Sequence, residues 1–288
     1  MFLPRKILER KLRKILEEDI GQGDITTALI VPERCTVEAE IVCKETGIVA
    51  GIEEAIVLLE SLGLKCEVLV KDGEKIRVNH VLMKIFGDAR AVFCVERTLL
   101  NIISRMSGIA TATTDIVNKI REAGLKTKVA CTRKTALGLL YFDKKAVLIG
   151  GGDTHRLHLD DMVLIKDNHI AVAGSVEEAI RRVKRNVSFS KKIEVEVTRI
   201  ADVLSAAKTG VDIIMLDNFS PEQIEKAIKS LKKSGFFGKV LLEASGGITR
   251  QNILKFASTG VNIVSLGEIT DSSKSLDISL EITKIKET

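Results

Sequence analysis

The sequence contains few aromatic residues: there is no tryptophan, one tyrosine and nine phenylalanines among 288 residues. Proteins that hold single-stranded nucleic acid usually stack its bases on aromatic side chains. The 44 lysines and arginines exceed the 39 acidic residues by only five charges. We therefore expect no dedicated nucleic-acid surface, although a local pocket for an anion is compatible with this composition.

Long hydrophobic runs are also missing, since none approaches the ~18 residues that a spanning helix needs. Residues 4–19 form a charged amphipathic pattern with Leu8, Leu12 and Ile15 on one stripe. This segment lacks the apolar core and cleavage site of a signal peptide. With 45% hydrophobic and 29% charged residues, the chain is expected to be a globular cytoplasmic protein without a membrane segment.

Cysteine is sparse and scattered. No CxxC pair occurs, which argues against both a zinc site and a disulfide framework. We expect buried thiols at the five positions, Cys35, Cys43, Cys66, Cys94 and Cys131.

The pattern of residues 36–88 predicts short strands and one helix over 52–62 that ends before Gly63. This pattern predicts a small α/β domain. An apolar periodic stretch follows over 89–123, and it predicts a helix that breaks at Ser107 and Gly108. We place the connection between two domains there.

After Lys126, apolar strands alternate with amphipathic helices, which predicts parallel strands with right-handed crossovers. Residues 206–218 and 256–268 repeat one another as helix end, glycine turn and buried strand, which favours a β/α barrel. A further strand could lie around residues 144–150. The alternative is a doubly wound sheet, but His155 stands where a GxGxxG motif needs its last glycine.

Charged residues gather where the barrel strands should end, and in such barrels the chemistry takes place there. The cations imply an anionic ligand with several charges, because guanidinium and ammonium groups bind carboxylates and phosphates. Ordinary solvated loop residues are the alternative. The group comprises Arg133, Lys134, Arg156 and Lys166, with His155, His158 and His169 nearby.

Glu196 and Asp217 end two strands and could hold Mg²⁺ together with substrate oxygens. They could instead only neutralise the lysines. The turn Ser245-Gly246-Gly247, followed one unit later by Gly267, could bind phosphate through backbone N–H groups, or be a tight turn without a ligand. A metal site at His155 and His158, three residues apart, is a further alternative.

These motifs, in this order, resemble the quinolinate phosphoribosyltransferase family, also called nicotinate-nucleotide pyrophosphorylase (carboxylating). The resemblance extends over nearly the whole chain. Its motifs are GDITT at 23–27, ERTLLNIISRMSGIAT at 96–111, TRKT at 132–135, GGG at 150–152, LIKDNH at 164–169, EVEV at 194–197, IMLDN at 214–218, EASGGI at 243–248 and VSLGEIT at 264–270.

The resemblance implies an α/β fold with an N-terminal α/β sandwich domain, residues 1–110, completed by residues 270–288. Residues 111–269 would form an open barrel of seven strands. It also implies a homodimer, or an oligomer built from dimers, whose active sites are shared, with Arg97 reaching the neighbouring subunit's site.

By the same resemblance, the activity would be the transfer of a phosphoribosyl group from phosphoribosyl pyrophosphate to quinolinate. The products would be nicotinate mononucleotide, pyrophosphate and CO₂ in NAD synthesis, with Mg²⁺ as cofactor. Lys134, Lys166, Glu196 and Asp217 would be catalytic, the last two beside ribose and Mg²⁺. The other implied contacts are Arg97, Thr132, Arg133, His155 and Arg156 for the dicarboxylate, and Ser245, Gly246, Gly247 and Gly267 for the 5′-phosphate.

The chain departs from the family's usual pattern in three places: Leu137 and Leu140 in the TRKTALGLL loop, Thr154 before the His-Arg pair, and Asp271 where a histidine beside the phosphate is expected. Nicotinate is an alternative acceptor, and the molybdenum-transport relatives of the family are disfavoured by LIKDNH. From other classes, a Schiff-base aldolase using Lys134 or Lys166, or a silent anion-binding protein, remains open.

Overall fold

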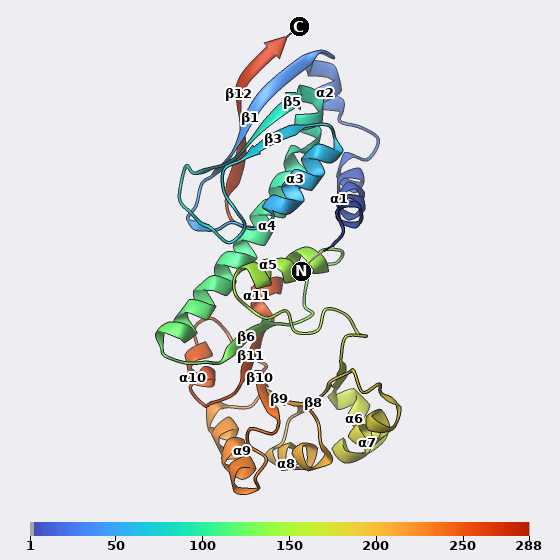
Figure 1. Cartoon of the computed structure of the whole chain (residues 1–288), viewed down its shortest axis with the longest axis vertical. Coiled ribbons are helices and arrows are strands. Elements are labelled where there is room, and N and C mark those ends of the chain that lie inside the picture. The colour runs from blue at the N-terminus through green and yellow to red at the C-terminus, as the bar shows by residue number, and fades with distance from the viewer. Residues whose placement is uncertain (1–2, 288) are drawn as a thin grey trace. The chain divides into compact units, whose positions relative to one another are not determined.

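The computed structural model describes residues 3–287 and divides into two compact units (Figure 1). The first unit contains the described residues up to 114, residues 141–151, and the described residues from 273 onward. The second contains residues 115–140 and 152–272.

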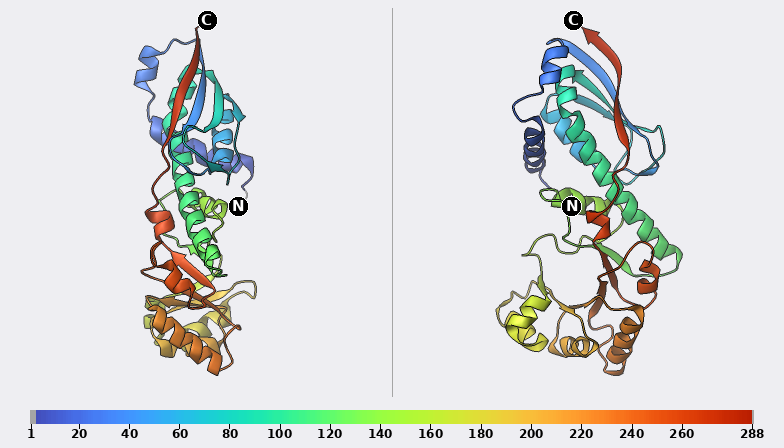
Figure 2. Two further views of the ribbon diagram at one scale, coloured as in Figure 1. Left: turned by 90° about the vertical axis from the view of Figure 1, so that its left-hand side faces the viewer. Right: turned by 180° about the vertical axis from the view of Figure 1, so that it is seen from behind.

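An antiparallel sheet of four strands, in the order β12-β1-β5-β3, forms the centre of the first unit. The last strand of the chain pairs with the first, so β12 lies beside β1 in each view of Figures 1 and 2. A small pair of strands, β2 and β4, stands apart from this sheet. The strands are β1 (Cys35–Cys43), β2 (Gly47–Ile48), β3 (Lys65–Val68), β4 (Lys75–Ile76), β5 (Val81–Asp88) and β12 (Ile278–Glu287).

Helices of the first unit are α1 (Arg5–Ile20), α2 (Ile25–Ile30), α3 (Ile52–Ser61), α5 (Leu140–Ile149) and most of α4 (Ala89–Glu122). The expected stripe on α1 needs one correction: Leu16 is buried beside Leu8 and Leu12, whereas Ile15 is half-buried. Among the cysteines, Cys66 and Cys94 are half-buried rather than buried.

The helix break expected at Ser107 and Gly108 is wrong, because α4 runs without interruption through both residues. Gly108 instead allows a close approach: a Cβ atom there would lie 2.1 Å from the backbone oxygen of Lys274. The nearby Ser107 hydroxyl accepts a hydrogen bond from the backbone N–H of Ala50 at 2.9 Å. These small residues therefore serve packing rather than helix termination.

The second unit is built on a parallel sheet in the order β6-β11-β10-β9-β8-β7. Its strands are β6 (Lys128–Cys131), β7 (Val163–Ile165), β8 (Ile193–Val197), β9 (Ile213–Asp217), β10 (Leu241–Ser245) and β11 (Ile263–Leu266). The helices are α6 (Asp167–Ala173), α7 (Val176–Asn186), α8 (Ile200–Thr209), α9 (Pro221–Lys233), α10 (Ile253–Ala257) and α11 (Glu268–Asp271). In Figure 1, α8 and α9 flank the outer side of this row of strands.

Local sequence signals explain these elements. Ser175 accepts a hydrogen bond from the backbone N–H of Glu178 at the start of α7, and Ser220 forms a capping box with Gln223 at the start of α9. The strands are almost entirely buried, as parallel strands covered by helices should be. The expected open β/α barrel is thus confirmed as a mixed α/β fold.

Among the described residues the barrel sheet has six strands, and a single bridge between Ala130 and Asp153 stands where a seventh would lie. The strand considered around residues 144–150 is wrong, because these residues belong to α5 or directly follow it. The ranges expected from the sequence place α5 with the barrel, whereas the compact units place residues 141–151 with the N-terminal sheet. Polar contacts hold them there: Asp143 binds Arg105 at 2.7 Å and Lys145 binds Glu54 at 2.7 Å.

No helix in residues 3–287 is long and apolar enough to cross a membrane.

Candidate active site

A cavity of about 660 Å³ opens at the carboxyl ends of the barrel strands. Nearly all the site residues expected from the sequence line it: Thr132, Arg133, Lys134, His155, Arg156, Lys166, Glu196, Asp217, Ser245, Gly246, Gly247 and Gly267. Arg97 does not; it is exposed on α4 in the first unit. The second unit therefore brings together every expected group except the one expected to serve a neighbouring subunit.

Two guanidinium groups give the cavity its cationic character. Arg156 is only 9% exposed, while Arg133 is exposed. Burial lowers the pKa of Arg156, and the nearby charge of Arg133 lowers it further. Two cations that repel each other in a partly buried place favour binding of an anion that can neutralise both.

The two lysines that line the cavity are held by different contacts. The Lys166 ammonium lies 3.2 Å from the Glu196 carboxylate at the end of β8. The backbone of Lys134 is fixed by two hydrogen bonds, because its N–H donates to the Thr132 hydroxyl at 3.1 Å and its carbonyl accepts from the Thr270 hydroxyl at 2.7 Å. Both lysines line the cavity, Lys166 paired with a strand-end carboxylate and Lys134 with its backbone held by two threonines.

Asp217 occupies the end of β9, one strand from Glu196. Its carboxylate accepts a hydrogen bond from the Asn218 amide at 2.9 Å. Asn218 has a left-handed backbone, φ 56°, and its own N–H donates to the Ser245 carbonyl at 2.8 Å. This bond ties the end of β9 to the glycine turn after β10.

The glycine turn needs glycine for two reasons. Gly246 has φ +88°, and a Cβ atom there would lie 2.8 Å from the backbone nitrogen of Asn218. Gly247 also has positive φ but meets nothing within 4 Å, so its backbone faces open space in the cavity wall. After the neighbouring strand β11, a Cβ atom at Gly267 would come within 3.2 Å of both the Lys134 side chain and the Asp271 carboxylate. Asp271 is exposed and belongs to the lining.

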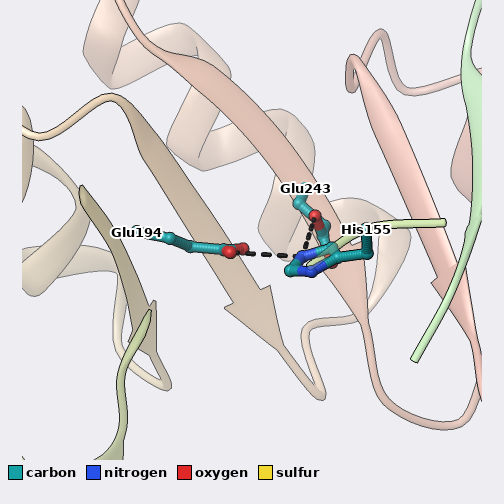
Figure 3. Close-up of side chains that lie close together, drawn as sticks. All are labelled: His155, Glu194 and Glu243. Carbon is teal, nitrogen blue, oxygen red and sulfur yellow. Dashed lines mark ion pairs between the residues drawn. The ribbon is translucent and has the colours of Figure 1, made fainter. Parts of the chain in front are cut away.

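His155 contacts two carboxylates that sequence reasoning did not assign to the site. Its Nε2 atom lies 3.2 Å from Glu194 and 3.3 Å from Glu243, and the two carboxylates approach the ring from β8 and β10 (Figure 3). We call these three residues the His155 cluster. A signal was present in the sequence, because Glu194 and Glu243 each lie between two apolar residues of a buried strand, where a charged residue requires a partner.

At neutral pH the His155 cluster holds one proton more than its members would hold in water. Burial opposes the charged imidazole, but the bonds to Glu194 and Glu243 raise the pKa of His155 to about 10. Burial also raises the pKa of Glu194, with the Glu243 charge adding to the rise. His155 and Glu194 therefore titrate together rather than independently.

The other two histidines near the site lie elsewhere. His158 is exposed beside Asp160 and Asp161, which are exposed as well. His155 and His158 therefore belong to separate groups of possible ligands, which does not support a metal site that uses both. His169 accepts a hydrogen bond from the Lys166 N–H at 2.9 Å, so it shapes the start of α6.

A second cavity, of about 760 Å³, lies where several barrel strands begin. It shares His155, Arg156 and Glu243 with the first. Its lining includes neither Glu196 nor Asp217, and it lacks the glycine turn. The converging charges therefore identify the cavity at the carboxyl ends as the candidate active site.

Comparisons with known proteins identify the family of the chain. The family model for the quinolinate phosphoribosyl transferase C-terminal domain matches residues 109–281, and the one for the N-terminal domain matches residues 24–107. The chain is 49% identical over 277 residues to a probable nicotinate-nucleotide pyrophosphorylase [carboxylating] of Methanocaldococcus jannaschii, covering 95% of this chain and 96% of that protein.

Solved structures give the same result. The nicotinate-nucleotide pyrophosphorylase of Francisella tularensis aligns with a TM-score of 0.88 at 38% identity, covering 98% of each chain. Human nicotinic acid phosphoribosyltransferase aligns with a TM-score of 0.64 at 12% identity, covering 96% of this chain and 74% of that one, and this shows a shared fold alone.

Proposed function

The chain belongs to the quinolinate phosphoribosyltransferase family, and from this premise we propose that it transfers the phosphoribosyl group of phosphoribosyl pyrophosphate to quinolinate. Pyrophosphate and CO₂ leave, and nicotinate mononucleotide is formed for NAD synthesis. The observation that carries the proposal is the single cavity in which cations face two carboxylates and a glycine turn.

The acceptor half of the cavity suits a dicarboxylate. Arg133 and Arg156 repel each other, and a ligand with two carboxylates gives each guanidinium a partner. Thr132, Lys134 and His155 complete this half. A monocarboxylate such as nicotinate would leave part of this cationic charge uncompensated, which is the reason to prefer quinolinate.

The donor half suits a phosphorylated sugar. Ser245, Gly246, Gly247 and Gly267 would receive the 5′-phosphate, with backbone N–H groups as donors. Glu196 and Asp217 are oxygen donors at neighbouring strand ends, so the donor set fits Mg²⁺ held together with oxygens of phosphoribosyl pyrophosphate. The bound ion would neutralise charge on the departing pyrophosphate.

The chain's own cations support the reaction. As the bond between ribose and pyrophosphate breaks, the sugar gains positive and the leaving group negative character, and the pyridine nitrogen forms the new bond to C1. Lys134 and Lys166 would stabilise the leaving charge, and Glu196 and Asp217 the sugar side. The carboxylate beside the ring nitrogen is then lost as CO₂, and the ring carbon takes up a proton.

We further propose that the protein forms a homodimer with shared active sites and that it is located in the cytoplasm. The exposed position of Arg97 leaves its side chain available to another subunit. The five cysteines are all free thiols, which is typical of a reducing compartment.

The decisive assay supplies the purified protein with Mg²⁺, phosphoribosyl pyrophosphate and either quinolinate or nicotinate. Mononucleotide, pyrophosphate and CO₂ are followed separately. We expect all three products from quinolinate and no mononucleotide from nicotinate. Mononucleotide formed from nicotinate alone would show that nicotinate, not quinolinate, is the acceptor. No mononucleotide from either compound would reject the transferase activity. Borohydride trapping with a carbonyl substrate would then test Lys134 and Lys166 as Schiff-base amines.

A further inference from the structure

The two carboxylates of the His155 cluster are buried, although the His155 ring borders the cavity. Glu194 and Glu243 are 0% exposed, and the His155 side chain is 12% exposed. Nε2 and all four carboxylate oxygens are buried, and their contacts with one another are the ion-pair distances of 3.2 and 3.3 Å. Figure 3 shows the two carboxylates directed at the edge of the ring that carries Nε2. A substrate in the cavity cannot reach these oxygens.

The other ring nitrogen is also occupied. Nδ1 of His155 lies 2.8 Å from the backbone nitrogen of Arg156, and Nε2 faces the two carboxylates. Both ring nitrogens therefore have neighbours within the protein.

The backbone here is held in an uncommon conformation. His155 has φ 52°, in the left-handed region that few non-glycine residues adopt. Its N–H donates to the Asp153 carboxylate at 2.9 Å, and its carbonyl accepts from the Thr154 hydroxyl at 2.9 Å. The turn is thus fixed on both sides, and the next residue along the chain is Arg156, whose guanidinium lines the acceptor end of the cavity.

We propose that Glu194 and Glu243 are positioning residues for the acceptor: by holding the His155 ring, they fix the turn that directs Arg156 at the quinolinate carboxylates. This inference rests on the proposed function and adds two residues to it. Both carboxylates are buried, so they act through the ring and through the Arg156 backbone that the ring contacts.

The test compares two substitutions of similar volume at each position. Glu194→Met and Glu243→Met remove the acceptor for the Nε2 hydrogen, whereas Glu194→Gln and Glu243→Gln keep an amide oxygen in its place. Glu225→Gln, exposed on α9, is the matched control. Steady-state kinetics give the KM for each substrate and kcat, and calorimetry with quinolinate alone gives its Kd.

We expect the Met variants to raise the KM and Kd for quinolinate at least tenfold, with the KM for phosphoribosyl pyrophosphate changed less than twofold. The Gln variants should stay within threefold of wild type. Equal increases for both substrates, an unchanged quinolinate Kd, or Gln variants as impaired as Met variants would each overturn the inference.

If the Met variants do not fold, Glu194→Ala and Glu243→Ala replace them. These changes also remove the carboxylate that faces Nε2, and the same selective loss of quinolinate binding is expected; unaltered binding would overturn the inference. A wild-type protein that does not convert quinolinate would overturn the proposed function and this inference together. An active wild type with unaffected variants would overturn the inference alone.

Discussion

At the scale of single residues, the two arginines of the acceptor end have different environments. Arg156 is buried and fixed through the His155 turn, while Arg133 is exposed in the loop after β6. A ligand that covers Arg133 would remove water from around it. Its contact with a carboxylate would then contribute more than an ordinary surface ion pair does.

Replacing Arg133 by alanine should therefore weaken quinolinate binding by roughly 2–5 kcal/mol, the cost of removing one partner from a desolvated charge pair. Isothermal titration with quinolinate measures this change. Arg185→Ala, an exposed arginine on α7, is the control and should bind as wild type does. An Arg133→Ala protein with unchanged affinity would reject a carboxylate contact at this residue.

The proton held by the His155 cluster predicts a pH dependence of stability. The folded pKa of His155, about 10, lies above its ordinary value of 6.5, so the folded state keeps a proton that the unfolded chain releases. This contribution is complete below about pH 6.5 and is lost as pH rises through about 10; it amounts to at most about 5 kcal/mol.

Urea unfolding of wild type and His155→Asn at pH 6, 8 and 10 tests this. Asparagine tolerates the left-handed backbone of this position. Other titrating groups are common to both proteins, so the difference between their free energies of unfolding should shrink as pH rises. A difference that stays constant from pH 6 to 10 would contradict the assignment of the retained proton to this cluster.

At the scale of elements, α5 is attached to the first unit by buried charge. Lys145 binds Glu54 at 2.7 Å and also contacts Glu53, both at the start of α3. Glu54 is fully buried, and burial raises its pKa despite the opposing charge of Lys145. A buried pair of this kind adds little net stability over an apolar pair, but removing one partner is costly.

Lys145→Met should lower the free energy of unfolding by about 3–5 kcal/mol, because it leaves Glu54 buried without its cation. The double variant Lys145→Met with Glu54→Leu should recover much of this loss. Urea denaturation measures both, with Lys11→Met on the exposed side of α1 as control. A single variant as stable as the control would show that Glu54 does not depend on Lys145.

How far the sequence predicts these elements depends on whether the signal is local. The strands and helices after Lys126 follow from apolar periodicity and helix caps, which are properties of neighbouring residues. The role of Gly108 does not follow from its neighbours, because glycine usually weakens a helix and the close approach of Lys274 comes from a distant part of the chain. The role of Glu194 depends on His155, which lies 39 positions earlier in the sequence.

At the scale of the whole molecule, the family relationship covers both units, since the two family models together match residues 24–107 and 109–281. The cavity, however, lies entirely in the second unit. Of the residues expected to serve the acceptor, Arg97 alone lies in the first. A shared site in a homodimer would give this arginine a function in the active site of another subunit.

Mixing two inactive proteins tests such sharing. Arg97→Ala and Lys134→Ala should each lack activity alone, because each loses one cation of the acceptor or leaving-group contacts. If Arg97 serves the neighbouring site, a dimer with one subunit of each kind contains one site with both changes and one site with neither. After subunit exchange at equal concentrations, half of the dimers would be mixed, so about one quarter of wild-type activity per site should return.

Arg97→Ala mixed with itself is the control, and exchange is verified by mass spectrometry of labelled subunits. Verified exchange without recovery would show that Arg97 does not complete a partner's site.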